Sequence, residues 1–192
     1  MRKIISKEES EEKSRRNKII VSVVLVLIMA LSTAGYGFLQ NPTEKSKNII
    51  VNEFKFEEQN EVWVSNINGN NFAFIKNPEE ITNETKNLKV DLKKLDSYSG
   101  KPLYLDSEDS QAEIEIYKNL EQISERIQSA CFNGEECTGN FPIKNCTENL
   151  IIIREANIKN ISQNGSCVFI YGNNESLSEV TDEFLFRILG VR

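Results

Sequence analysis

The strongest hydropathy pattern is an apolar run, residues 19–39, that contains no charged side chain. At about 1.5 Å per residue, a helix over this run spans roughly 30 Å, which matches the hydrocarbon core of a bilayer. Basic residues are frequent before the run and sparse just after it. The positive-inside rule then predicts a transmembrane helix over 19–39, a cytoplasmic basic tail over 1–18, a linker over 40–48 and an extracytoplasmic domain over 49–192.

Two other interpretations of the apolar run remain open. The small residues Ser32-Thr33-Ala34 suit a signal-peptidase site, so a cleaved signal peptide is one alternative. A pilin-like structural subunit is the other, although Arg16-Asn17-Lys18 stands where a pilin leader normally places Gly or Ala beside a charged residue. The membrane anchor and the signal peptide both leave the rest of the chain outside the cytoplasm.

Short apolar segments after the run predict strands. A first strand is expected over 49–56, and the segments 62–64 and 72–75 flank the dipeptide Asn68-Gly69. Both residues tolerate positive φ, so Asn-Gly between apolar segments predicts a β-hairpin. Further strands are expected over 101–105, 150–153 and 167–171.

Two segments predict helices. The first covers about 110–130, where four branched apolar residues recur on one helical face, and Ser110 with Glu113 predicts a capping box. The four are Ile116, Leu120, Ile123 and Ile127. The second helix covers about 177–189, with Ser176 and Glu179 as its cap and Gly190 at its end.

The second helix has apolar residues around most of its surface, so we expect a core helix in preference to an exposed patch for a partner. Helices and strands together predict an α+β domain. It would be a mainly antiparallel sheet with two helices packed on one face, preceded by the transmembrane helix.

Composition excludes several classes of chemistry. The chain has 192 residues and no histidine, which removes Ser–His–Asp and Cys–His nucleophiles and every metal site with imidazole ligands. A net charge of −6 disfavours nucleic-acid binding, which requires a basic surface. Phosphate-binding glycine motifs are absent from the sequence, so no cofactor is expected.

Four cysteines follow the apolar run, namely Cys131, Cys137, Cys146 and Cys167. An even number of cysteines in an exported domain predicts two structural disulfides. A C-x-x-C motif is absent, which disfavours redox chemistry and a four-cysteine zinc site. Among the three connectivities we prefer Cys131–Cys137 with Cys146–Cys167, although spacing alone leaves the others open.

An acidic cluster, Asp106, Glu108 and Asp109, precedes the first predicted helix. It suggests either a cation site or charge that stabilises the helix N-terminus, and we favour the second because the spacing fails the EF-hand pattern. A pair of carboxylates could also serve glycoside hydrolysis, but the sequence singles out no pair. We therefore expect no catalytic residues and no metal ligands.

Asparagine sequons predict glycosylation if the host has the machinery. The candidates are Asn83, Asn160, Asn164 and Asn174, whereas Asn145 lies next to a cysteine and is the weakest.

Several short motifs together resemble uncharacterised archaeal single-pass membrane proteins that carry a small exported domain with cysteines. They are Lys101-Pro102-Leu103-Tyr104, Ala130-Cys131, Pro142-Ile143-Lys144-Asn145-Cys146, Cys167-Val168-Phe169-Ile170 and Asp182-Glu183-Phe184-Leu185-Phe186. The resemblance implies the membrane topology and paired cysteines, and it implies no activity.

We therefore expect a membrane-anchored extracytoplasmic domain that binds or scaffolds an envelope protein or polymer at the cell membrane. The alternatives are a carboxylate-dependent hydrolase of envelope polymers and the pilin-like subunit.

Overall fold

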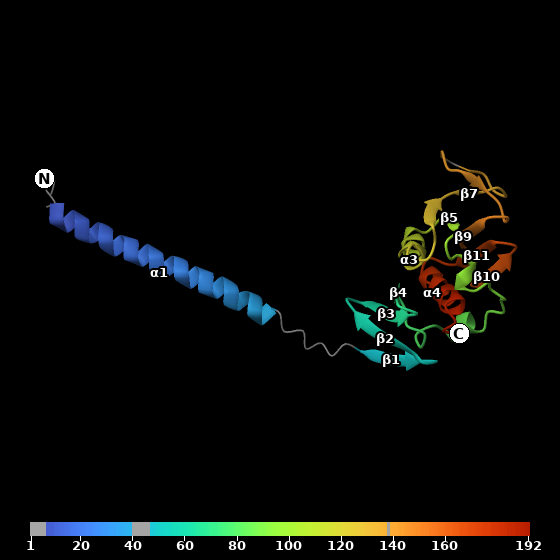
Figure 1. Ribbon diagram of the computed structural model, residues 1–192, viewed down its shortest axis with the longest axis horizontal. Coiled ribbons are helices and arrows are strands. Elements are labelled where there is room, and N and C mark those ends of the chain that lie inside the picture. The colour runs from blue at the N-terminus through green and yellow to red at the C-terminus, as the bar shows by residue number, and fades with distance from the viewer. Residues whose placement is uncertain (1–6, 40–46, 138) are drawn as a thin grey trace. The chain divides into compact units, whose positions relative to one another are not determined.

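The computed structural model describes residues 7–39, 47–137 and 139–192. The chain divides into two compact units, 1–45 and 46–192. The first unit contains one long helix, α1 (Lys7–Leu39), drawn in blue in Figure 1. The described side chains of α1 are exposed, including apolar ones such as Val26 and Leu31.

The expected transmembrane helix over 19–39 is contradicted. The helix begins at Lys7, so it includes the charged segment that precedes the apolar run. Among the described residues, no helix is both long and apolar enough to cross a membrane.

The second unit begins with an antiparallel sheet of four strands in sequence order. The strands are β1 (Asn48–Val51), β2 (Phe54–Gln59), β3 (Val62–Ile67) and β4 (Asn70–Phe74). The hairpin predicted at Asn68-Gly69 is confirmed, with φ of 53° and 87° at the two residues. The single strand expected over 49–56 is wrong, because Asn52 and Glu53 adopt positive φ and turn the chain between β1 and β2.

The second sheet has five strands in the order β10-β11-β9-β5-β6. They are β5 (Pro102–Ser107), β6 (Arg126–Ser129), β9 (Asn149–Glu155), β10 (Asn160–Asn164) and β11 (Cys167–Gly172). All pairings are parallel except that of β10 with β11. The α+β prediction of a mainly antiparallel sheet is therefore contradicted, and the fold is α/β.

The physical reason for this correction lies in the segments 150–153 and 167–171. Their continuous apolar sequence is typical of parallel strands that are buried on both faces. One face carries Ile151 and Ile153 into the main core, and the other carries Leu150 and Ile152 into a second, smaller core. The sequence pattern showed that these strands are buried, but it did not show their direction.

Shorter elements complete the second unit. They are α2 (Asn83–Lys86), the 3-10 helix η1 (Leu95–Ser97), β7 (Cys131–Phe132) and β8 (Ile143–Lys144). β7 and β8 pair in parallel.

Helix α3 (Ser110–Leu120) is shorter than the predicted 110–130. The chain turns after Leu120 and then forms β6, where Ile127 contacts the core from a strand. The predicted Ser110–Glu113 cap is also wrong, because the Asp109 side chain accepts the hydrogen bond from the N–H of Ala112. The apolar residues that predicted one long helix are thus divided between α3 and β6.

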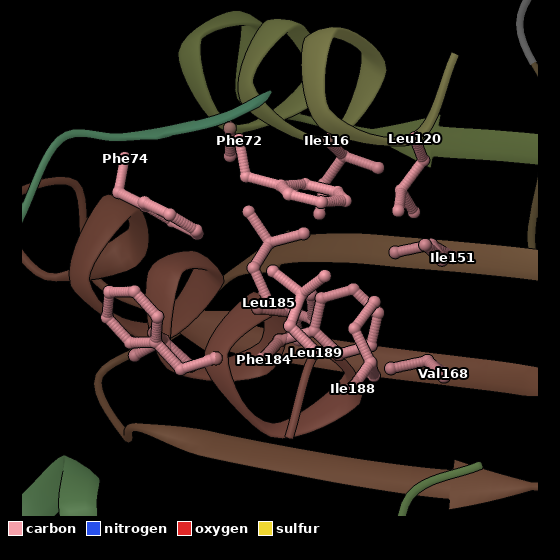
Figure 2. Packing of buried hydrophobic residues seen from close by; sticks show 14 of the residues in the cluster. Phe72, Phe74, Ile116, Leu120, Ile151, Val168, Phe184, Leu185, Ile188 and Leu189 are labelled. Carbon is pink, nitrogen blue, oxygen red and sulfur yellow. The ribbon is translucent and has the colours of Figure 1, made fainter. Parts of the chain in front are cut away.

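Helix α4 (Leu177–Ile188) matches its predicted extent and is a core helix, as expected. Its apolar residues surround it because it contacts both sheets. On one side it packs on β11, and on the other Phe186 contacts Phe74 with ring centroids 4.6 Å apart. Figure 2 shows Leu185 of α4 and Leu189, which directly follows the helix, among side chains from β4, α3 and the five-stranded sheet. The helices α3 and α4 thus form the middle of three layers (Figure 1).

The predicted cap at the start of α4 does not form, because Ser176 makes no side-chain cap bond. Glu179 instead accepts a hydrogen bond of 2.6 Å from the Thr82 hydroxyl.

Both disulfides are present, joining Cys131 to Cys137 and Cys146 to Cys167. This is the connectivity that the sequence spacing favoured. The Cys146–Cys167 disulfide lies on the face of the five-stranded sheet that the helices leave uncovered, where Tyr104 and Phe169 form the smaller core with Cys167. The disulfides indicate an oxidising, extracytoplasmic compartment.

Candidate functional site: an acidic crevice

The crevice lies at the carboxyl ends of β5, β6 and β9. The chain leaves β5 toward α3 on one face of the sheet, and it leaves β6 toward Cys131 and β7 on the other face. Two adjacent parallel strands whose connections diverge in this way open a crevice, which is the usual ligand position in α/β sheets. The cavity here has a volume of about 310 Å³.

Arg154, at the end of β9, is the central cation of the crevice. Its Nη2 lies 3.0 Å from Asp106 Oδ1 and 2.7 Å from Glu135 Oε2, and its Nε lies 3.7 Å from Glu108 Oε1. Nη1 also donates to the backbone carbonyl of Asp106 at 2.9 Å. The side chain is 11% exposed, so these contacts fix the guanidinium at the wall of the crevice.

The pKa of Arg154 reflects two opposing effects. Partial burial disfavours the charged guanidinium, but the hydrogen bonds to Asp106 and Glu135 outweigh burial and raise the pKa above its ordinary value. Arg154 is therefore a permanent positive charge at this position.

The short disulfide loop positions two of the lining carboxylates. Cys131 lines the crevice, and the disulfide to Cys137 closes a loop that contains Glu135 and Glu136. The loop is also tied to β5, because the N–H of Phe132 donates to Asp106 Oδ2 at 2.6 Å. The disulfide thus holds these acidic side chains over the ends of the strands.

The crevice is strongly acidic. Its lining includes five carboxylates and one guanidinium, that of Arg154. The carboxylates are Asp106, Glu108, Glu113, Glu135 and Glu136. The exposed ring of Phe141 also lines the cavity, and an aromatic face attracts cations. This combination of negative charge and an aromatic ring suits a positively charged ligand.

The structure separates the acidic cluster that the sequence singled out. Asp109 caps α3, as the helix-terminus interpretation predicts, whereas Asp106 and Glu108 contact Arg154 in the crevice. Arg154 and Glu135 were missed. Their contacts join residues 19 to 48 positions apart. The parallel register of β5 with β9 brings Arg154 beside Asp106, and the disulfide loop brings Glu135 to Arg154.

A second acidic pair, Glu115 and Asp182, is enclosed between α3, α4 and the end of β4. Glu115 Oε1 accepts from the N–H of Ile75 at 3.4 Å, and Asp182 Oδ2 accepts from the N–H of Lys76 at 2.6 Å. Their other oxygens, Oε2 of Glu115 and Oδ1 of Asp182, are buried and make no hydrogen bond to a donor.

Burial dominates the titration of this pair. Desolvation, followed by the charge of Asp182, raises the pKa of Glu115 well above its usual value. Desolvation likewise raises the pKa of Asp182 to about 7, although contacts with Glu115 and the N–H of Lys76 act against it. Both carboxyl groups therefore keep their protons up to a higher pH than ordinary Asp and Glu side chains do. Because Glu115 is 6% exposed and Asp182 fully buried, a polymer substrate does not reach them.

Three of the glycosylation candidates, Asn83, Asn164 and Asn174, are exposed, and Asn160 is half-buried in β10. No three His, Cys, Asp or Glu side chains in the described ranges are arranged to hold a metal ion.

Comparison with protein-family models, curated proteins and solved structures finds no match to the chain.

Proposed function

We propose that residues 46–192 form an extracytoplasmic binding domain that takes a cationic ligand in the acidic crevice. The observation that carries this proposal is the lining of five carboxylates against the single guanidinium of Arg154. Its position at the carboxyl ends of parallel strands supports the same conclusion. The proposal keeps the binding role expected from the sequence and does not include a membrane anchor.

The geometry favours an ammonium or guanidinium group on a slender apolar stem. Asp106 is largely buried and its carboxylate is already paired with Arg154. Glu135 is half-exposed, and Glu108 is more exposed still. Both carboxylates already have partners, since Glu108 Oε2 also accepts from the N–H of Glu155 at 3.0 Å, but their exposed side chains can contact a second cation beside Arg154. The ring of Phe141 offers an apolar surface for the stem. A lysine-rich segment of an envelope protein and a polyamine both have this chemistry.

The carboxylate-dependent hydrolase receives less support. Such an enzyme needs two reachable carboxyls whose environments push their pKa values apart. The strongly shifted pair, Glu115 and Asp182, is enclosed in the core, so it does not supply that arrangement at the surface.

Calorimetric titration of the full chain with spermidine and with trilysine tests the proposal. Replacing Glu136→Gln in the crevice removes one negative charge, which in water is worth about 1 kcal/mol at 4 Å. We expect roughly fivefold weaker binding and a clear loss of affinity with added salt. The matched control is Glu125→Gln, an exposed carboxylate outside the crevice lining. Equal affinities for both variants would contradict the proposal.

A further inference from the structure

A second cavity, of about 400 Å³, carries the opposite charge to the crevice. Its lining includes four cationic side chains, those of Lys86, Lys94, Arg187 and Arg192, and one acidic side chain, that of Asp91. Two partly buried aliphatic side chains form the rest of the wall. A concentration of positive charge is unusual in a chain whose net charge is −6.

The two arginines are held in place by one buried carboxylate. Arg187 Nε donates to Glu183 Oε1 at 2.7 Å, and Arg192 Nη1 donates to Glu183 Oε2. Each guanidinium makes a further bond to the backbone, Arg187 to the carbonyl of Lys86 at 3.0 Å and Arg192 to that of Pro78. Their side chains are 17% and 19% exposed. Both guanidiniums are thus oriented before any ligand arrives.

The side-chain charges at this cavity do not balance. Glu183 is fully buried and neutralises one of the two guanidiniums. Asp91 offsets one more cation, which leaves two positive charges among the four basic side chains. Fixed guanidiniums bind oxyanions through paired N–H donors, and lysine adds a mobile charge.

We propose that this cavity binds a small oxyanion with at least two negative charges, of the phosphate or polycarboxylate class. Arg187 and Arg192 form the fixed part of the site, and Lys94, in the segment between α2 and η1, adds an exposed ammonium group to the lining. The site is independent of the acidic crevice, since the two cavities share no lining residue.

The test uses the full chain and follows backbone amide shifts and thermal unfolding with inorganic phosphate, citrate and chloride at matched ionic strength. We expect phosphate or citrate to raise the melting temperature and shift amides at Lys86, Lys94 and Arg187, whereas chloride does neither. The tighter of the two anions identifies the class. Stabilisation by chloride equal to that by both anions would overturn the proposal.

Variants locate the site. Lys94→Gln is an exposed change that leaves the Glu183 contacts intact, and we expect it to weaken anion binding about threefold to tenfold. Lys94→Glu should weaken binding further. The matched control, Lys118→Gln on the exposed surface of α3, should retain full affinity. If Lys94→Gln binds as tightly as Lys118→Gln, the proposal is wrong.

Discussion

Single polar side chains join the four-stranded sheet to the helices. Asn119 of α3 bonds to both backbone groups of Ala73 at the edge of β4. Its Oδ1 accepts from the N–H of Ala73 at 2.8 Å, and its Nδ2 donates to the carbonyl of Ala73 at 2.7 Å. Gln122 continues the contact at the carbonyl of Asn71. The side chains thus satisfy an edge that would otherwise be free to pair with another strand.

Replacing Asn119→Ala should destabilise the domain by about 2–4 kcal/mol, because it leaves a partly buried N–H and carbonyl of Ala73 without partners. Gln122→Ala is the control in the turn just after α3, where exposure limits the loss to about 1 kcal/mol or less. Urea denaturation measures both values. Equal losses for the two variants would contradict this role of Asn119.

The buried pair Glu115 and Asp182 predicts an unusual pH dependence. The folded-state pKa of Asp182 is raised from 3.8 to about 7, so its contribution to stability is full below pH 4 and is lost as pH rises through 7. Glu179 acts oppositely. Hydrogen bonds from Thr82 outweigh burial and lower its pKa from 4.5 to about 2, so its contribution is lost as pH falls through that range. The combined contribution of Asp182 and Glu179 to the free energy of unfolding should therefore be highest between these two ranges, near pH 4–5.

Denaturation in urea at several values between pH 3 and pH 8 tests this expectation. Asp182→Asn keeps an acceptor for the N–H of Lys76 and removes one of the two titrating groups of the pair. It should flatten the decline between pH 4 and pH 7, which for one proton is at most about 1.4 kcal/mol per pH unit. The surface variant Asp96→Asn should leave the decline intact. A wild-type chain whose stability rises steadily from pH 4 to pH 7 would show that the pair is not protonated.

At the scale of elements, local signals predicted well and non-local ones did not. The hairpin at Asn68-Gly69 and helix α4 depend on residues that are adjacent in sequence, and both are confirmed. The predicted end of α3 was wrong, because Ile123 and Ile127 contact the core from a turn and a strand, and their spacing is also compatible with a helix. Parallel pairing of β5 with β9 has no local sequence signal, so the crevice that depends on it was not predicted.

The Cys131–Cys137 loop supplies two of the carboxylates that line the crevice. Removing the Cys131–Cys137 bond with Cys131→Ser and Cys137→Ser frees the segment that holds Glu135 on Arg154. We expect weaker spermidine binding, because the carboxylates are no longer ordered before the ligand binds. Calorimetry well below the melting temperature measures the change.

The other disulfide provides the control. Cys146→Ala with Cys167→Ala opens a loop of sequence separation 21 away from the crevice lining. Its loss should lower stability by about 3 kcal/mol and leave spermidine affinity unchanged in the folded protein. The reverse outcome, with affinity lost only in this variant, would contradict the role given to the short loop.

At the scale of the molecule, the second unit has two cavities of opposite charge. The core lies between its three layers. The acidic crevice is at the carboxyl ends of the parallel strands. The basic cavity is lined by the segment after α2 and by the end of α4. The disulfides place this unit in an oxidising compartment. Composition did not reveal these two sites, because the net charge averages over both of them.

The most direct test of the cation site is a titration of the full chain with spermidine, followed by the chemical shifts of its backbone amides. Binding in the crevice predicts progressive shifts at the ends of β5 and β9 and in the loop after Cys131, with Asp106, Arg154 and Glu135 among the largest. The shifts should decrease with added salt. Shifts that spread evenly over exposed acidic residues, or that leave Asp106 and Arg154 unchanged, would contradict a cation site at the acidic crevice.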